Sequence, residues 1–383
     1  MRVVKEDGLP IKLWLEDIED SALDQARNLA RLPFAFSHIA LMPDAHLGYG
    51  MPIGGVMATK GVVVPNAVGV DIGCGMLAVR TSLESIERED VKRVMGEIRK
   101  AVPVGFKHRA EPVAIGAMPE PAIEGGIVGQ QFASARSQIG TLGGGNHFIE
   151  LQQGDDGRVW VMIHSGSRNL GLKVAKHYND AAKELNAQWF SAVPKKWDLA
   201  FLPTDSSLAT FYLHEMRYCV DFALANRQMM IRAVEECLAD VVGIVDFDDP
   251  INIAHNYAAM EHHFGQNVMV HRKGATSARE GEIGIIPGSQ GTKSYIVRGL
   301  GNAQSFNSCS HGAGRTMGRK QAKRELDLAE QQALLNGIVH SVRHVDDLDE
   351  APGAYKDIAT VMANQTDLVE VVVELTPIGV VKG

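Results

Sequence analysis

The chain has 383 residues, of which 45% are hydrophobic and 22% are charged, and its formal net charge is −8 at pH 7. These ordinary globular values exclude a disordered chain, a collagen-like rod and a coiled-coil rod. The negative charge also argues against a protein that simply coats nucleic acid, because such proteins neutralise phosphates with Lys and Arg.

Hydrophobic spacing predicts four main helices and a set of buried strands. Apolar residues recur at helical spacing over 16–32, 84–101, 171–190 and about 205–241. Short apolar runs cut by glycine and proline predict strands over 39–80, 141–151, 158–164, 249–318 and 367–382. The pattern also predicts a basic helix near 318 and a short helix over 355–364, and it is weakest over 105–140, a predicted surface excursion.

The order of these elements predicts the domain organisation. The helical middle, about 171–241, separates two strand regions that carry the motifs described below. We therefore expect residues 1–383 to form a single large α+β domain with mixed β-sheets. Four scattered cysteines are too few for a disulfide framework, and no run approaches the roughly 18 apolar residues of a membrane helix. A cytoplasmic protein without membrane association is expected.

Five segments place a possible metal ligand beside glycine or another small residue. The residues are Asp71 and Cys74 in GVDIGCG, His147 in GGGNH, His164 in HSGSR, His255 in HNY, and Asp44 with His46 in PDAH. Taken singly, each is better explained as a small buried thiol or a hydrogen-bonded core histidine. Together they favour a metal site, in which a thiolate can bridge two ions and the carboxylate favours a harder ion such as Mn²⁺.

A second cluster of motifs is suited to phosphate. Residues 268–324 contain ten Lys and Arg against two Glu, a net charge of +8, which leaves −16 for the rest of the chain. Glycine turns among these charges expose backbone N–H groups that can hold phosphate. A solvated basic face is the alternative explanation. The surrounding Gly, Ser and Asn residues favour a local phosphate or RNA surface.

The segment SCSHGAGR, residues 308–315, places His311 in a glycine turn with Arg315 four residues later. A neutral imidazole nitrogen is a competent nucleophile, and a nearby cation stabilises the phosphoryl charge that it attacks. A turn histidine that hydrogen-bonds to the backbone explains these residues equally well.

Ordered sequence blocks over nearly the whole chain resemble the RtcB family of RNA ligases. They run from Pro33-Phe34 to Val381-Lys382-Gly383 and include MPDxHLG, VGVDIGCG, GTLGxGNHFIE, HSGSR, HNY, RKGATSA, GIIPGSxGTKSYIVRGLGN, SCSHGAGR and AYKD. The resemblance implies an RtcB-like fold and an enzyme that joins an RNA 3′-phosphate or 2′,3′-cyclic phosphate end to a 5′-hydroxyl end. Such an enzyme acts in RNA repair or tRNA processing.

The resemblance also implies roles for individual residues. Two Mn²⁺ ions would bind Asp71, Cys74, His147, His164 and His255, with Cys74 bridging. His311 would take GMP from GTP as a histidine–guanylate. Arg168, Lys273 and Arg315 would engage phosphates, and Asp44 would accept a proton. The residues implied to contact GTP are Asn146, His147, Phe148, Ile149, Glu150, His255, Asn256, Pro287, Gly288, Ser289, Gln290, Ser294, His311, Gly312, Ala313, Gly314 and Lys382.

Two other functions stay open at this point. A dinuclear metal phosphoesterase acting on RNA ends would need the metal ligands but not His311. An RNA- or ribosome-associated binding factor would hold a structural metal. Ala254 and Asn169 depart from residues usual in the family, Cys and Gly respectively. The physiological RNA and any need for a protein activator therefore stay open as well.

Overall fold

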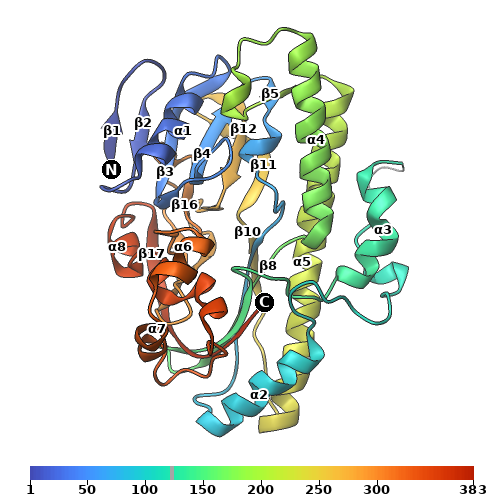
Figure 1. Cartoon of the computed structure of the whole chain (residues 1–383), viewed down its shortest axis with the longest axis vertical. Coiled ribbons are helices and arrows are strands. Elements are labelled where there is room, and N and C mark those ends of the chain that lie inside the picture. Colours follow the sequence, from blue (N-terminus) through green and yellow to red (C-terminus); the bar gives the residue numbers. More distant parts are fainter. Residues whose placement is uncertain (121–124) are drawn as a thin grey trace.

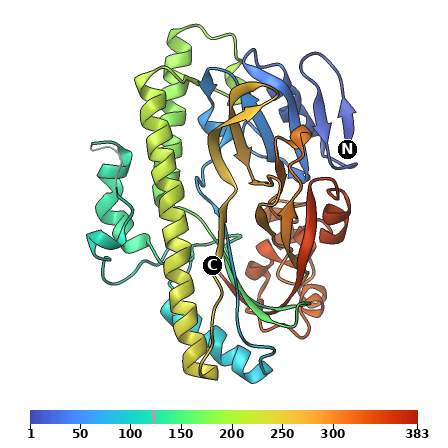
Figure 2. The same cartoon turned by 180° about the vertical axis from the view of Figure 1, so that it is seen from behind.

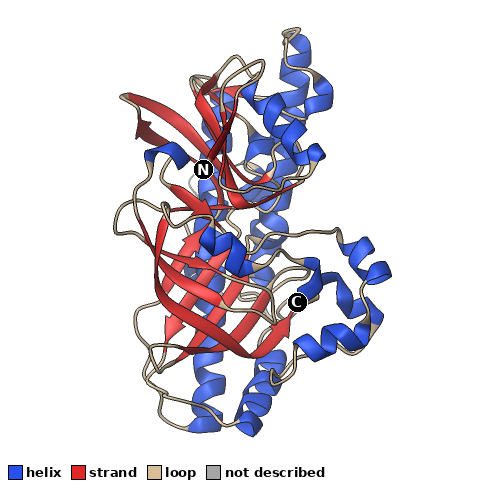
Figure 3. Ribbon diagram, turned by 90° about the vertical axis from the view of Figure 1, so that its left-hand side faces the viewer, coloured by secondary structure: helices blue, strands red, loops and turns tan. Residues whose placement is uncertain are grey.

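The computed structural model describes residues 1–120 and 125–383. This part of the chain contains a six-stranded and a seven-stranded sheet, one above the other, with two long helices along one side (Figures 1 and 3). Two small two-stranded sheets complete the β-structure of the described residues. The predicted α+β fold with mixed sheets is confirmed.

The six-stranded sheet is mixed, because β2 and β3 are parallel and the other neighbours are antiparallel. Its strands in spatial order are β1 (Arg2–Val4), β2 (Ile11–Leu13), β3 (Ala35–His46), β4 (Ile53–Thr59), β12 (Gln266–Lys273) and β11 (Asn256–His263). The two small sheets pair β13 (Ala275–Ser277) with β16 (Ser308–Ser310), and β5 (Val62–Val63) with β9 (Leu202–Pro203).

The seven-stranded sheet is antiparallel and has a hydrophobic cluster on each face. Its strands in spatial order are β10 (Ile251–Ala254), β6 (Gly75–Arg80), β8 (Val159–Ser165), β7 (Phe148–Gly154), β17 (Val369–Lys382), β15 (Ser294–Gly299) and β14 (Ile283–Ile286). Successive side chains of β6 alternate between the faces: Leu77 and Val79 join one cluster, whereas Met76 and Ala78 join the other. Burial on both faces explains the continuous apolar runs in this sequence.

The predicted helices are present with small shifts in their ends. The helices of the described residues are α1 (Asp20–Ala30), α2 (Arg88–Ala101), α3 (Ile127–Gln138), α4 (Arg168–Gln188), α5 (Ser207–Val242), α6 (Arg319–Glu325), α7 (Leu328–Leu334) and α8 (Ile358–Ala363). Helix α5 has 36 residues and is therefore about 54 Å long. It contacts both large sheets and lies beside α4, as Figure 2 shows from behind. Among the described residues, no helix has the length and apolar character needed to cross a membrane.

The stretch 105–140 differs in part from its prediction. It projects from the body of the molecule (Figure 1), but it also contains helix α3, which packs on α4 and α5. Only Val128, Ala135 and Gln138 of α3 are buried, so its apolar periodicity is weak. Residues 121–124 of this stretch lie outside the described residues.

Candidate active site

The five predicted metal ligands lie close together and form two groups that share Cys74. Cys74, His164 and His255 make one group, and Asp71, Cys74 and His147 make the other, with the candidate ligand atoms of each group within 4.8 Å of one another. The Sγ atom of Cys74 is 3.3 Å from Nε2 of His164 and 3.5 Å from Nε2 of His147. Oδ2 of Asp71 is 3.2 Å from Nε2 of His147.

Strand register brings these side chains together at one end of strands β6, β7, β8 and β10 of the seven-stranded sheet. His164 in β8 lies opposite Met76 of β6 and Phe148 of β7. Cys74 lies two residues before Met76, and His147 directly precedes Phe148. Glycine makes the close approach possible. A Cβ on Gly75 would lie 2.0 Å from the carbonyl oxygen of Ile253 in β10, so any larger residue would push these strands apart.

The donor set and its burial fit a divalent transition metal. Burial lowers the pKa values of His164 and His255 well below the usual range, and neighbouring histidines lower them further. Both imidazoles are therefore neutral and offer a lone pair at neutral pH. Burial raises the pKa of the Cys74 thiol, and Asp71 raises it further. Thiol, imidazole and carboxylate groups together suit Mn, Fe or Zn ions.

His311 follows β16 and is held by Asp44 of β3. Its ring Nδ1 lies 2.6 Å from Oδ2 of Asp44, and its backbone N–H donates to the same oxygen at 3.1 Å. Asp44 is fully buried, so its carboxylate faces the protein and not solvent. The predicted metal ligand His255 is a direct neighbour, with ring centroids 4.7 Å apart. His46 comes from the same segment as Asp44 and belongs to neither of the two ligand groups found among the described residues.

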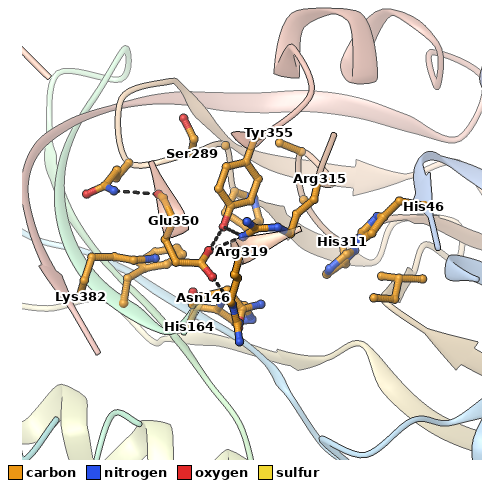
Figure 4. Close-up of a pocket in the computed structure, with 18 residues that line it drawn as sticks. His46, Asn146, His164, Ser289, His311, Arg315, Arg319, Glu350, Tyr355 and Lys382 are labelled. Carbon is orange, nitrogen blue, oxygen red and sulfur yellow. Dashed lines mark hydrogen bonds and ion pairs between the residues drawn. The ribbon is translucent and has the colours of Figure 1, made fainter. Parts of the chain in front are cut away.

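A cavity opens beside His311 (Figure 4) and contains most of the residues implied to contact a nucleotide. The implied residues that line it are Asn146, Phe148, Pro287, Gly288, Ser289, Gln290, His311, Gly312, Ala313, Gly314 and Lys382. Arg315, His164 and His46 line it as well. The cavity thus combines glycine-turn N–H groups with cationic side chains, a pairing suited to phosphate.

Six other residues implied to contact GTP do not line the cavity, and two of these hydrogen-bond to backbone groups near it. Ser294 Oγ accepts from the N–H of Gly288 at 3.1 Å and shapes the 287–290 turn. Asn256 donates to the carbonyl of Asp71 and accepts from the N–H of Gly274. His147 and His255 belong to the metal groups instead.

The last two of these residues, Ile149 and Glu150, are buried. The side chain of Ile149 lies in a hydrophobic cluster. Burial raises the pKa of Glu150 to about 7, although Lys382 and a hydrogen bond from Gln152 act in the opposite direction.

Glu350 is the main cavity residue that the sequence motifs do not predict. Its carboxylate accepts from Arg315 at 2.8 Å and from Arg319 at 2.7 Å, and the Tyr355 hydroxyl also donates to it (Figure 4). Burial acts to raise the pKa of Glu350, but Lys382, Arg315, Arg319 and Tyr355 outweigh burial and lower it. Tyr355 lies in the AYKD block and Arg319 in the basic segment, so both carried a sequence signal. Glu350 carried none.

Lys273 and Arg168 do not line the cavity. Lys273 Nζ donates to the carbonyls of Tyr49 at 2.5 Å and Asn66 at 3.2 Å, and burial lowers its pKa to about 7. Arg168 has a positive φ of 59° and donates to Thr141 Oγ1 at 3.1 Å. Its pKa is lowered by burial, whereas Asp71 and Cys74 act to raise it.

The basic segment 268–324 does not form one unpaired cationic face. Several of its cations form ion pairs with acidic residues from other parts of the chain: Arg272 with Glu261, Lys293 with Glu374, Arg298 with Glu370, and both Arg315 and Arg319 with Glu350. Acidic residues outside this segment therefore neutralise much of its positive charge. The cations that line the cavity are Arg315, Arg319 and Lys382.

Comparisons with known proteins place the chain in a family. The family model described as tRNA-splicing ligase RtcB matches residues 25–126 and 116–383. The chain is 40% identical to the RNA-splicing ligase RtcB of Escherichia coli strain K12, over 98% of each protein. It is 32% identical to the tRNA-splicing ligase RtcB of Thermococcus kodakarensis, over 100% of this chain and 94% of that protein. For the RNA-splicing ligase RtcB of Mycobacterium tuberculosis the identity is 33%, over 94% and 100%. These matches span the metal groups, the His311 turn and the cavity, and the chain belongs to the RtcB family.

Proposed function

We propose that this protein is an RNA ligase that joins 3′-phosphate or 2′,3′-cyclic phosphate ends to 5′-hydroxyl ends, using GTP and two Mn²⁺ ions. Membership of the family and relatives named RNA-splicing and tRNA-splicing ligases support an RNA substrate. The observation that carries the chemistry is the position of His311. It is hydrogen-bonded to Asp44, lines the cavity and lies next to the predicted metal ligand His255.

Asp44 prepares His311 to act as a nucleophile. A carboxylate that accepts from Nδ1 fixes the tautomer in which Nε2 has a free lone pair. In the proposed reaction Nε2 bonds to the α-phosphorus of GTP, and the bond from phosphorus to pyrophosphate breaks. Water opens a 2′,3′-cyclic phosphate end to a 3′-phosphate by breaking the bond from phosphorus to the 2′-oxygen. The histidine–guanylate then passes GMP to the RNA 3′-phosphate. The 5′-hydroxyl then attacks this activated end, and GMP leaves.

The remaining cavity residues hold and orient the phosphates. The turn after His311 offers backbone N–H groups, whereas the N–H groups of Gly288 and Ser289 already bond within the protein. Arg315 and Lys382 offer positive charge. Asp71, Cys74, His147, His164 and His255 would hold the metal ions. When bound, divalent ions at these residues would supply Lewis-acid polarisation of phosphoryl oxygens.

A covalent-labelling experiment tests this function. The protein is incubated with GTP labelled at the α-phosphate and with Mn²⁺, and the label is followed on denaturing gels. We expect an acid-labile adduct on the native protein, none on His311→Ala, and a normal amount on His214→Ala, which replaces an exposed histidine of α5. An unlabelled native protein that holds its metal would contradict the proposal.

RNA joining separates the ligase from the alternatives. The substrate is a pair of oligonucleotides, one with a 3′-phosphate and one with a 5′-hydroxyl. Joined product that disappears in His311→Ala supports the ligase. Phosphate release that persists in His311→Ala would identify a phosphoesterase. RNA binding without either reaction would identify a binding factor with a structural metal.

A further inference from the structure

Arg227, in the middle of α5, is fully buried and pairs with no carboxylate among the described residues. Its guanidinium instead makes four hydrogen bonds to uncharged oxygens. Nη1 donates to the carbonyls of Gly73 at 3.2 Å and Ser165 at 2.7 Å. Nη2 donates to the carbonyl of Ile253 at 3.1 Å, and Nε donates to Oδ1 of Asn252 at 2.8 Å. A buried cation is costly unless such contacts satisfy it.

Each carbonyl that Arg227 contacts is next to, or two residues from, a predicted metal ligand. Gly73 precedes Cys74 and Ser165 follows His164. Ile253 lies two residues before His255. These three segments are far apart in sequence, and Cys74, His164 and His255 form one complete ligand group. A single planar side chain thus joins the three segments that must be aligned to build that group.

The neighbouring residue on α5 extends this arrangement. Asn226 is also fully buried, and its Nδ2 donates to the carbonyls of Thr141 at 3.3 Å and Gly166 at 3.1 Å. Its Oδ1 accepts from the N–H of Gly140 at 2.7 Å. These contacts fix the turn before the His147 loop and the turn after His164. Helix α5 packs against β6, β8 and β10, which carry or adjoin the same segments.

A second buried arginine shows how unusual the setting of Arg227 is. Arg272 is also fully buried, but it forms an ion pair with Glu261 and so balances its charge within the protein. Arg227 has no such carboxylate partner among the described residues, and three of its hydrogen bonds go to carbonyls close to Cys74, His164 and His255 in sequence. The hydrogen bonds of Arg227 therefore hold the backbone that carries the candidate ligands and are not part of a separate ion pair.

We propose that Arg227 is a positioning residue for the metal centre, which holds the segments of Cys74, His164 and His255 in binding geometry. This inference rests on the metal site of the proposed function. Arginine suits the role because its planar fork can donate to several fixed acceptors at once. Lysine would keep the charge, but its single ammonium on a flexible stem cannot align all four oxygens.

The test compares two buried polar residues of the same helix. Arg227→Lys removes the fork, whereas Glu215→Gln disturbs Glu215, which accepts from the N–H of Val128 and from Tyr178 and touches no ligand segment. Both variants are expected to lower the melting temperature of the metal-free protein. Only Arg227→Lys is expected to weaken Mn²⁺ or Co²⁺ binding, by about 10- to 100-fold.

Titration with Co²⁺ provides the readout that a general loss of stability would not change. The near-ultraviolet absorption from a cobalt–thiolate bond should shift or weaken in Arg227→Lys and stay unchanged in Glu215→Gln. Native affinity and an unchanged cobalt spectrum in Arg227→Lys would overturn the inference. Asn252→Ala removes one of the four acceptors and decides the question if Arg227→Lys does not fold. A loss of affinity of a few-fold in Asn252→Ala supports the inference, and native affinity overturns it.

These titrations contain neither GTP nor RNA, so they separate this inference from the proposed function. A native protein that binds Co²⁺ but forms no adduct on His311 would contradict the proposed function alone. A native protein that forms the adduct, with an Arg227→Lys variant of native metal affinity, would contradict this inference alone.

Discussion

Asp44 accepts two hydrogen bonds from His311, one from ring Nδ1 at 2.6 Å and one from the backbone N–H at 3.1 Å. One carboxylate oxygen therefore fixes both the tautomer of the ring and the turn that carries it. The turn comes close to the strand because of Gly314, where a Cβ would lie 2.2 Å from the Asp44 carbonyl oxygen. These hydrogen bonds thus anchor His311, the predicted nucleophile, to β3 of the six-stranded sheet. The other residues that line the cavity come mainly from other elements.

Asp44→Asn should slow guanylate formation and leave GTP binding nearly unchanged. The amide can donate to Nδ1 and so favour the tautomer that protonates Nε2, the attacking nitrogen. We expect the single-turnover rate of adduct formation to fall by about 10²- to 10⁴-fold. The GTP concentration at half-maximal rate should change little. Asp367→Asn, at a carboxylate that binds Trp14 Nε1, serves as the control. A native rate in Asp44→Asn would remove Asp44 from the mechanism.

Glu350→Gln should destabilise the protein and weaken GTP binding. The glutamine is neutral, so Arg315 and Arg319 lose their shared counter-charge and the charge-assisted hydrogen bonds weaken. We expect the free energy of unfolding in urea to fall by about 2–4 kcal/mol and the KM for GTP to rise. Glu370→Gln is the matched control, because its pair with Arg298 is exposed and should contribute less than about 1 kcal/mol. Equal effects of the two substitutions would show that Glu350 does not organise the cavity.

The long helices could be predicted, and the candidate metal ligands could be selected, because their signals are local. Helix α2 buries Val91, Val94, Met95 and Ile98, which repeat at helical spacing and so reveal the helix in the sequence. The ligands are visible because each stands beside small residues that permit close approach. Cys74 could be named as the shared ligand from the family resemblance, and the two ligand groups of the structure both contain it.

The rest depended on contacts that are distant in sequence. Helix α3 is stabilised by contacts with α4 and α5, and its own buried residues are too few to produce a pattern. Glu350 is the last residue of a short 3-10 helix, Val345–Glu350, and its importance comes only from the cations that surround it in space. The net charge of the basic segment was correct as arithmetic. Much of its positive charge is paired with acidic residues outside the segment, such as Glu261 and Glu374. These pairings depend on the folded structure and cannot be recognised from the local sequence.

Lys273 should make the stability of the protein depend on pH between about 7 and 10. Burial lowers the pKa of Lys273 to about 7 from an ordinary value of 10.5. Between these values the unfolded chain binds more protons than the folded chain, so the contribution of Lys273 to the free energy of unfolding rises with pH. Below pH 7 both states are protonated, and the folded protein bears the full cost of the buried cation.

Lys273→Met removes this titration and provides the measurement. Urea unfolding of both proteins is followed at pH 7, 8, 9 and 10 in the presence of EDTA, which excludes effects of metal binding. As pH rises, the free energy of unfolding of the native protein should increase relative to that of Lys273→Met by up to about 1.4 kcal/mol per pH unit. Lys107→Met, at an exposed lysine, is expected to follow the native curve. Parallel curves for native protein and Lys273→Met would show that Lys273 keeps its ordinary pKa.

Cys74→Ala should remove more metal than the loss of either neighbouring histidine. Cys74 belongs to both ligand groups, whereas His255 belongs to one and His147 to the other. After loading with Mn²⁺ and gel filtration, we expect about two ions in the native protein and about one in His255→Ala or His147→Ala. Cys74→Ala should hold close to none, because each group loses a ligand in a site where no other thiol lies within reach among the described residues. Cys309→Ala, at a fully buried cysteine outside both groups, should keep the native content. Equal metal contents in Cys74→Ala and His147→Ala would mean that the thiolate serves one ion and does not bridge two.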